Sequence, residues 1–199
     1  MIEAILAGLA ATGPLEGISV VLGVVYSILA VKRSRWCWLA GGISSGILVY
    51  LSWIAKLPMQ ACLQAYYVGM SVYGFWRWSQ EVGDTRAVST LPLSAHAAAC
   101  AAILVVSLLS SRFLSGGTQA AWPFLDSFVT WGSLFATWLV AQVKLENWLY
   151  WIVLNALAVF LYAQQGLMFV ALLMVVYFVV AVVGFITWFR TWRAHAQPS

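Results

Sequence analysis

The sequence predicts an all-α integral membrane protein of seven transmembrane helices, arranged as a parallel tandem repeat of three helices, one connecting helix and three helices (3+1+3). Three observations predict this fold: an apolar composition, seven long apolar segments, and an internal similarity between the two halves of the chain. Hydrophobic residues make up 63% of the 199-residue chain and charged residues only 8%. A soluble domain carries about a quarter charged residues, so a soluble chain this apolar could not cover its surface with polar groups.

Seven apolar segments are long enough to cross a bilayer, which takes about 20 residues in a helix. Charged residues, prolines, glycines and glutamines separate them. The expected spans are residues 15–31, 36–55, 58–78, 94–114, 123–143, 146–164 and 167–189. The first residues lack a positively charged start, so we interpret residues 1–14 as an N-terminal surface segment rather than a cleaved signal peptide.

The lysines and arginines predict the orientation of these spans, because positive residues concentrate in cytoplasmic loops. Only Lys56 and Arg112 fall on one side of the membrane. The other side holds the remaining eight, which are Lys32, Arg33, Arg35, Arg77, Arg86, Lys144, Arg190 and Arg193. We therefore expect the N-terminus outside and the C-terminal tail, residues 191–199, in the cytoplasm.

The chain aligns with itself, without gaps, at a single fixed offset that brings Glu16 onto Asp126; we call it the repeat offset. The aligned pairs also include Trp38 with Trp148, Tyr67 with Tyr177, and Gly74-Phe75-x-x-Trp78 with Gly184-Phe185-x-x-Trp188. Four spans separate the copies, so both run in the same direction. We expect a first repeat at 15–78, a connector with the fourth helix at 79–122 and a second repeat at 123–190. Transporters built from such repeats bind their substrates between the halves, near the middle of the membrane.

Polar residues at helical spacing form three narrow faces. They are Trp148, Trp151, Asn155 and Tyr162 on the sixth span, Gln60, Gln64, Tyr67, Ser71 and Trp78 on the third, and Asp126, Thr130, Ser133 and Thr137 on the fifth. Polar groups facing hydrocarbon are costly, so these faces should point inward. The counterparts of the third-span and sixth-span faces in the other repeat are mostly small or apolar. This pattern predicts a pocket with one aromatic, amide-bearing wall and an opposite wall with room.

Such a pocket suits a flat, uncharged or cationic ring that bears hydroxyls. Tryptophan faces stack on rings and attract cations, while asparagine and glutamine hydrogen-bond to hydroxyls or an amide. Other interpretations stay open for three residues. Trp148 could be an interfacial belt residue, Gln64 could hydrogen-bond between helices, and Asp126 could be a solvated charge at a helix end.

Other functional classes fit the sequence less well. The two histidines are peripheral and no paired carboxylates lie within the spans, which argues against an intramembrane enzyme. The absence of metal-ligand spacing or a basic run among aromatics indicates no cofactor, no metal and no nucleic-acid partner. No carboxylate falls at the middle of a span, which favours movement uncoupled from ions. A membrane receptor that binds a ligand without transporting it remains an alternative.

The sixth span also carries a family motif. Glu146-Asn147-Trp148-Leu149-Tyr150-Trp151, followed by Asn155 and Tyr162, resembles the signature of the PnuC vitamin transporters. The segments at Gln64-x-x-Tyr67, Leu125-Asp126-Ser127 and Tyr177 to Trp188 are similar to the same family. The residues that the motifs and the polar faces together assign to substrate binding are Trp151, Asn155, Gln64, Trp148, Tyr67, Asp126, Tyr162 and Tyr177.

The resemblance implies a SWEET-like 3+1+3 fold that forms a homotrimer in the bacterial inner membrane. It implies facilitated diffusion of nicotinamide riboside, a precursor of NAD, which phosphorylation then traps inside the cell. Met174 departs from the family pattern, where an aromatic or polar residue is expected. Similar proteins carry thiamine, riboflavin or nucleosides, so these substrates remain alternatives.

Overall fold

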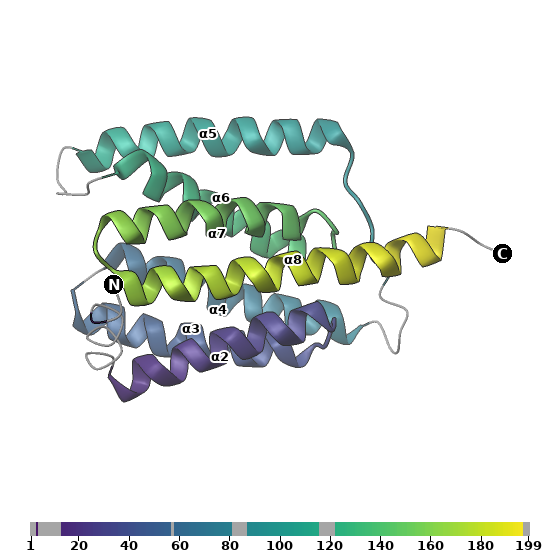
Figure 1. Ribbon diagram of the computed structural model, residues 1–199, viewed down its shortest axis with the longest axis horizontal. Coiled ribbons are helices and arrows are strands. Elements are labelled where there is room, and N and C mark those ends of the chain that lie inside the picture. The colour runs from purple at the N-terminus through teal and green to yellow at the C-terminus, as the bar shows by residue number, and fades with distance from the viewer. Residues whose placement is uncertain (1–2, 4–12, 57, 81–86, 116–121, 197–199) are drawn as a thin grey trace.

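Long helices, all running along one axis of the molecule, make up the protein (Figure 1). The computed structural model describes residues 3, 13–56, 58–80, 87–115 and 122–196. The helices in this part of the chain are α2 (Pro14–Val31), α3 (Trp36–Ile54), α4 (Pro58–Ser79), α5 (Leu93–Ser115), α6 (Pro123–Ala141), α7 (Asn147–Gln164) and α8 (Met168–Ala196). They confirm the prediction of seven helices in an all-α fold. Apart from residues 3, 13 and 14, the predicted surface segment lies outside the described residues.

The helix bounds agree closely with the predicted spans except at the C-terminus. There α8 continues to Ala196, although the apolar run was expected to end the span at residue 189. No glycine or proline lies between Gly184 and Pro198, so nothing in the sequence breaks the helix after its apolar part ends. The last turns of α8 therefore carry Arg190 and Arg193 beyond the apolar stretch.

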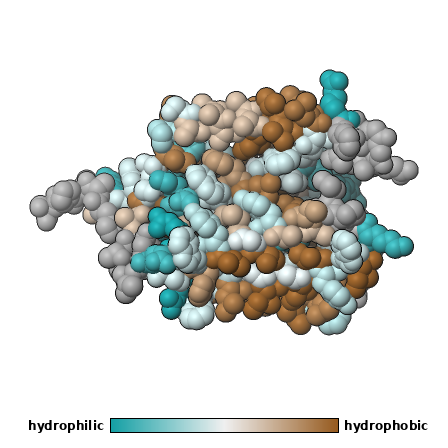
Figure 2. Space-filling model, turned by 180° about the vertical axis from the view of Figure 1, so that it is seen from behind, coloured by the Kyte–Doolittle hydropathy of each residue, from teal (hydrophilic) through white to brown (hydrophobic). Residues whose placement is uncertain are grey.

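Among the helices that the structure describes, five are apolar enough to cross a membrane by length and composition: α2, α3, α5, α6 and α8. The exceptions, α4 and α7, have 22 and 18 residues, which correspond to about 33 and 27 Å of helix. Both lengths fall within the range of about 17–25 residues that transmembrane helices have. Their lower hydropathy comes from the amides and hydroxyls that the sequence assigned to inward faces. On the face seen in Figure 2, the most hydrophilic side chains lie toward the two ends, and the most hydrophobic ones lie mainly between them.

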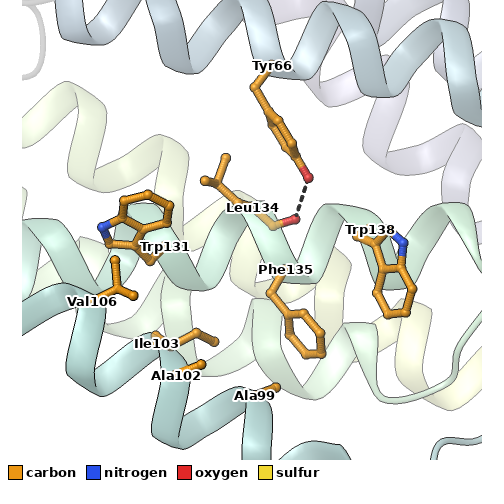
Figure 3. A pocket seen from close by; sticks show the side chains of 9 residues that line it. All are labelled: Tyr66, Ala99, Ala102, Ile103, Val106, Trp131, Leu134, Phe135 and Trp138. Atoms are coloured by element: carbon orange, nitrogen blue, oxygen red, sulfur yellow. Dashed lines mark hydrogen bonds between the residues drawn. The ribbon is translucent and has the colours of Figure 1, made fainter.

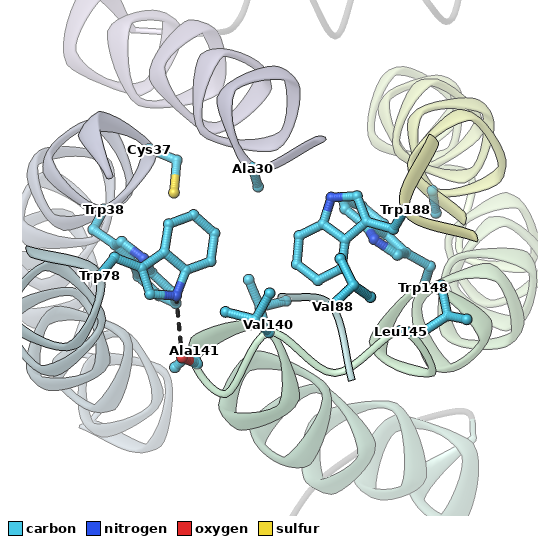
Figure 4. Close-up of a cluster of buried hydrophobic side chains, with 12 residues drawn as sticks. Ala30, Cys37, Trp38, Trp78, Val88, Val140, Ala141, Leu145, Trp148 and Trp188 are labelled. Carbon is cyan, nitrogen blue, oxygen red and sulfur yellow. Dashed lines mark hydrogen bonds between the residues drawn. The ribbon is translucent and has the colours of Figure 1, made fainter. Parts of the chain in front are cut away.

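Six of the helices form a closed ring. Within each repeat the helices pack in chain order, α2 on α3 on α4 and α6 on α7 on α8. Contacts of α2 with α8 and of α4 with α6 join the two halves, while α5 packs on the outside of α6. Figure 4 looks along the helices and shows both halves around a shared centre.

The backbone turns recur at the repeat offset, as the sequence does. Arg33 and Val143, which the repeat aligns, both have φ 54° just after the first helix of their half. Lys56 (φ 57°) and Gly166 (φ 75°), which it also aligns, take the same conformation after the second helix. Since few residues other than glycine adopt positive φ, these matches support the repeat more strongly than shared leucines do.

Tryptophan pairs occupy equivalent places in the two halves. Trp38 and Trp78 meet edge to face with ring centroids 5.4 Å apart, and Trp148 and Trp188 do the same at 5.4 Å. Each pair rests on a glycine, Gly74 or Gly184, where an added Cβ would collide with the indole of Trp38 or Trp148. The glycines that the sequence aligned are therefore needed for these close approaches.

The same tryptophans form hydrogen bonds that join the two halves. Trp78 Nε1 donates a hydrogen bond to the carbonyl oxygen of Ala141 at 3.1 Å, and Trp188 Nε1 donates to that of Val31 at 3.0 Å. Both carbonyls belong to the last residue of a helix, where no intrahelical donor is available. Each repeat thus caps the first helix of the other, as Figure 4 shows for Trp78.

Candidate functional site on the inner face of the helix ring

Gln64 of α4 and Asn155 of α7 carry the amides of the inner face. Their side chains are only 8% and 6% exposed. In the part of the chain that the structure describes, neither amide has a hydrogen-bond partner, and neither is completely enclosed by protein atoms. Buried amides are normally hydrogen-bonded within the protein. These two therefore face the interior of the ring with free capacity to donate and accept hydrogen bonds.

Two tyrosines approach the opposite repeat from equivalent positions. Tyr67 of α4 interacts with the hydroxyl of Ser133 on α6. Tyr177 of α8 approaches α2, where its hydroxyl lies 2.5 Å from the place that a Cβ on Gly23 would occupy. The repeat offset aligns Gly23 with Ser133. The predicted residues Tyr67 and Tyr177 thus line the two seams between the halves.

A polar path leads from Tyr67 toward the end of the ring opposite the basic loops. Tyr67 lies within electrostatic range of Tyr162, and Tyr162 within range of Asp126. Asp126 lies in the first turn of α6 and its side chain is exposed. The structure therefore brings Asp126 near the predicted site but also supports the interpretation of a solvated charge at a helix end.

The basic end of the ring, where Lys32, Arg77 and Lys144 lie at or beyond the ends of helices, is closed by packed side chains. Trp148 is only 4% exposed, rests against Trp188 and Gly184, and belongs to this closure. This burial among protein side chains argues that Trp148 is a packing residue rather than an interfacial belt residue. Trp151, one turn further along α7, is part-buried and packs against the same cluster. Figure 4 shows the cluster, which also includes Ala30, Cys37, Trp38, Trp78, Val88, Val140, Ala141, Val143, Leu145, Ala181 and Trp188.

The segment before α5 crosses the basic end and contributes to its closure. Val88 is 5% exposed within the cluster. Beside it, Ser89 bridges to the α6–α7 turn, its amide donating to the Val143 carbonyl at 3.2 Å and its carbonyl accepting from the Leu145 amide at 2.9 Å. Glu146 accepts a further hydrogen bond from the Leu91 amide at 2.9 Å. The connector is thus tied to the second repeat by backbone and carboxylate contacts.

Sequence reasoning missed Tyr26 of α2. Its ring lies edge to face against Trp38 at 5.7 Å and close to Tyr67. Protein atoms surround it, yet its side chain is part-exposed, so it borders the interior of the ring. The signal was Gly41, which the repeat aligns with Trp151. A Cβ on Gly41 would lie 2.8 Å from the Tyr26 ring, so Tyr26 fills the room that the glycine leaves.

The three cysteines differ in burial. Cys37 is buried in the core cluster. Cys62 and Cys100 are exposed on the outside of the helices, where the bilayer makes exposure of a small apolar side chain inexpensive.

An outward groove between α5 and α6 has a volume of about 380 Å³ (Figure 3). Its lining is almost entirely apolar: Tyr66, Ala99, Ala102, Ile103, Val106, Trp131, Leu134, Phe135 and Trp138. The polar tip of Tyr66 is occupied by a hydrogen bond to the Leu134 carbonyl at 3.0 Å. A polar ligand needs a few well-placed polar groups in its pocket. The groove contains no predicted site residue and lacks such a set of polar groups, so it is not the candidate site.

Comparisons with known proteins agree with this architecture. A family model described as nicotinamide mononucleotide transporter matches residues 13–190. The chain is 24% identical over 183 residues to the riboflavin/roseoflavin transporter RibM of Streptomyces davaonensis, covering 89% of this chain and 85% of the relative. It is also 24% identical over 213 residues to the nicotinamide riboside transporter PnuC of Escherichia coli, covering 93% and 89%.

A solved structure has the same fold. The crystal structure of the vitamin B3 transporter PnuC matches with a TM-score of 0.72 at 24% identity, covering 98% of this chain and 90% of that one. The resemblance that the sixth-span motif suggested is thereby confirmed. The chain is a multi-pass membrane protein of the nicotinamide mononucleotide transporter family, in which the PnuC vitamin transporters belong, and its function is vitamin transport rather than catalysis.

Proposed function

We propose that this protein carries nicotinamide riboside across the bilayer by facilitated diffusion, with the substrate bound on the inner face of the helix ring. The unpaired amides of Gln64 and Asn155 carry this proposal. Nicotinamide riboside combines a carboxamide, a flat cationic ring and ribose hydroxyls. The amides can hydrogen-bond to the polar groups, and Trp151 and the tyrosines of the inner face can stack on a cationic ring.

The positions of the carboxylates support movement without ion coupling. A proton- or sodium-coupled carrier needs a titratable or multi-oxygen site within the membrane. Glu16 and Asp126 lie in the first turns of α2 and α6, and Glu146 lies just before α7 at the basic end. No acidic residue of the sequence falls at the middle of a span. The substrate would then run down its own gradient and be retained inside by phosphorylation.

Riboflavin is the second candidate substrate. The similarity to RibM is as high in identity as the similarity to PnuC and extends over most of both chains. The isoalloxazine ring system of riboflavin is much wider than a pyridinium ring, so the two ligands need different amounts of space inside the helix ring. A non-transporting receptor is the candidate from another class.

Orientation and assembly belong to the same proposal. The excess of lysine and arginine at one end supports a cytoplasmic location for that end in a bacterial inner membrane, with the N-terminus outside. Resemblance to the PnuC family supports a homotrimer. A reporter that works only in the cytoplasm should be active when fused after Arg193 and silent in the turn at Gly166. The reverse pattern would overturn the orientation, and a monomeric mass by native mass spectrometry in mild detergent would overturn the trimer.

A binding screen on the purified protein tests the substrate. Nicotinamide riboside, riboflavin, thiamine and a nucleoside are titrated side by side in isothermal calorimetry. The proposal expects saturable binding of nicotinamide riboside at least tenfold tighter than the others. Tighter binding of riboflavin would favour the second candidate, and the absence of binding by any of the four would refute vitamin recognition by this site.

A further inference from the structure

The two repeats each place one large and one small residue at the same pair of positions, but on opposite helices. In the first repeat the large residue is Tyr26 on α2 and the small one is Gly41 on α3. In the second repeat their counterparts at the repeat offset are Ala136 on α6 and Trp151 on α7. Each half therefore supplies one aromatic ring from this pair of positions.

The rings occupy equivalent places in the two halves. Tyr26 lies over Gly41, in the seam between α2 and α3. At the repeat offset Trp151 corresponds to Gly41, and the fully buried Ala136 corresponds to Tyr26, so the repeat predicts that Trp151 lies at the equivalent seam between α6 and α7. In the ring of helices these seams belong to opposite halves. The two aromatic side chains therefore come from opposite halves of the ring and pack against the same buried cluster.

Both aromatic residues also lie at the same depth. Tyr26 precedes the buried Ala30 of the basic-end cluster by one helical turn, and Trp151 follows the buried Trp148 by one turn. Both are partly buried and pack against that cluster. In the described part of the chain the Tyr26 hydroxyl has no hydrogen-bond partner and is not completely enclosed.

We propose that Tyr26 and Trp151 are the two opposing aromatic walls that hold the ring of the substrate, and that Tyr26 sets the ring size the site accepts. This inference rests on the proposed function and names the residue that decides between its two candidate substrates. Tyr26 occupies the space above Gly41 that a wider ring would need. A single six-membered ring fits between the walls, whereas the three fused rings of riboflavin require Tyr26 to be absent or displaced.

The test measures how tightly the full-length protein in detergent binds nicotinamide riboside and riboflavin. The wild type is compared with Tyr26→Ala, Tyr26→Phe and the control Tyr50→Ala. Tyr50 lies on α3 with 57% of its surface exposed on the outside. Loss of one stacking wall should weaken nicotinamide riboside binding by about fivefold to a hundredfold in Tyr26→Ala, with Tyr26→Phe recovering most of that loss. Riboflavin binding should weaken less or strengthen, so that the ratio of the two dissociation constants shifts at least fivefold toward riboflavin.

A second pair of variants keeps the test decisive if Tyr26→Ala does not fold. Gly41→Ala forces the Tyr26 ring to move, whereas a Cβ on Gly46 of the same helix meets nothing within 4 Å. Gly41→Ala should therefore shift the ratio of affinities, and Gly46→Ala should leave it unchanged.

Two negative results are distinguishable. A wild-type protein that binds neither ligand removes the proposed function and this inference with it. A wild-type protein that binds nicotinamide riboside, with the ratio unmoved in both Tyr26→Ala and Gly41→Ala, overturns the role of Tyr26 alone.

Discussion

Replacing Trp188 by phenylalanine removes the indole N–H that donates to the Val31 carbonyl at 3.0 Å, while an aromatic ring stays against Trp148. The Trp188 side chain is fully buried, and without its indole N–H the carbonyl of the part-exposed Val31 loses this donor. An unmet buried polar group costs about 1–3 kcal/mol, and hydrogen bonds between membrane helices are worth about 0.6–1.7 kcal/mol. We expect Trp188→Phe to lower the free energy of unfolding by about 1–2 kcal/mol.

Thermal unfolding of the detergent-solubilised protein, followed by size-exclusion chromatography, measures this cost. At about 2–4 °C per kcal/mol for a chain of this size, Tm should fall by about 2–8 °C. Trp78→Phe removes the equivalent bond to Ala141 and should cost the same. The matched control is Trp131→Phe, whose indole donates at 2.9 Å to Ser110 on the outer face. If Trp131→Phe lowers Tm as much as Trp188→Phe does, the hydrogen bonds between the repeats have no special part in stabilising the fold.

Three further predictions concern the inner face and its closure. Gly184→Ala should fail to give a monodisperse protein or lower Tm by more than about 5 °C, because an added Cβ would lie 2.6 Å from the Trp148 indole. The control Gly46→Ala, with open space around it, should match the wild type, and equal Tm values for the two variants would contradict the packing argument. Asn155→Leu should weaken nicotinamide riboside binding in calorimetry by about tenfold or more without lowering Tm, because it removes a ligand contact and no contact within the protein. A lower Tm with unchanged affinity would show that Asn155 stabilises the fold instead of binding the substrate. Glu146→Ala frees the Leu91 amide, so hydrogen exchange of residues 87–91 should accelerate relative to the α6 core, and unchanged exchange would show that this contact does not hold the segment.

The repeat made much of the fold predictable. Glycines that aligned at 74 and 184, each four residues before a tryptophan, indicated equivalent packing in both halves, and the structure shows a close approach at each. The span ends were predictable wherever a turn residue follows, as at Gly166. The end of α8 was not, because its arginines stop the apolar pattern without stopping the helix. Helix continuation depends on backbone hydrogen bonds rather than on hydropathy.

The inner face was only partly predictable. Helical spacing brought Gln64, Tyr67 and Asn155 to inward positions, because a polar side chain has nowhere else to point in a bilayer. For Trp148 the same argument left an interfacial belt position open, and it did not predict that Trp148 would be buried against Trp188 and Gly184. Tyr26 was missed because a lone tyrosine among apolar residues has no periodic pattern. Its contact with the space above Gly41 is visible only in the structure.

Uptake of nicotinamide riboside into vesicles containing the purified protein tests the central claim most directly. The account predicts saturable uptake that stops at equal internal and external concentrations and ignores imposed pH or sodium gradients. Asn155→Leu should slow this uptake at low substrate, and Tyr50→Ala, altered only on the outer surface, should not. Binding without uptake would identify a receptor, and accumulation above equality under either gradient would contradict uncoupled transport through the ring.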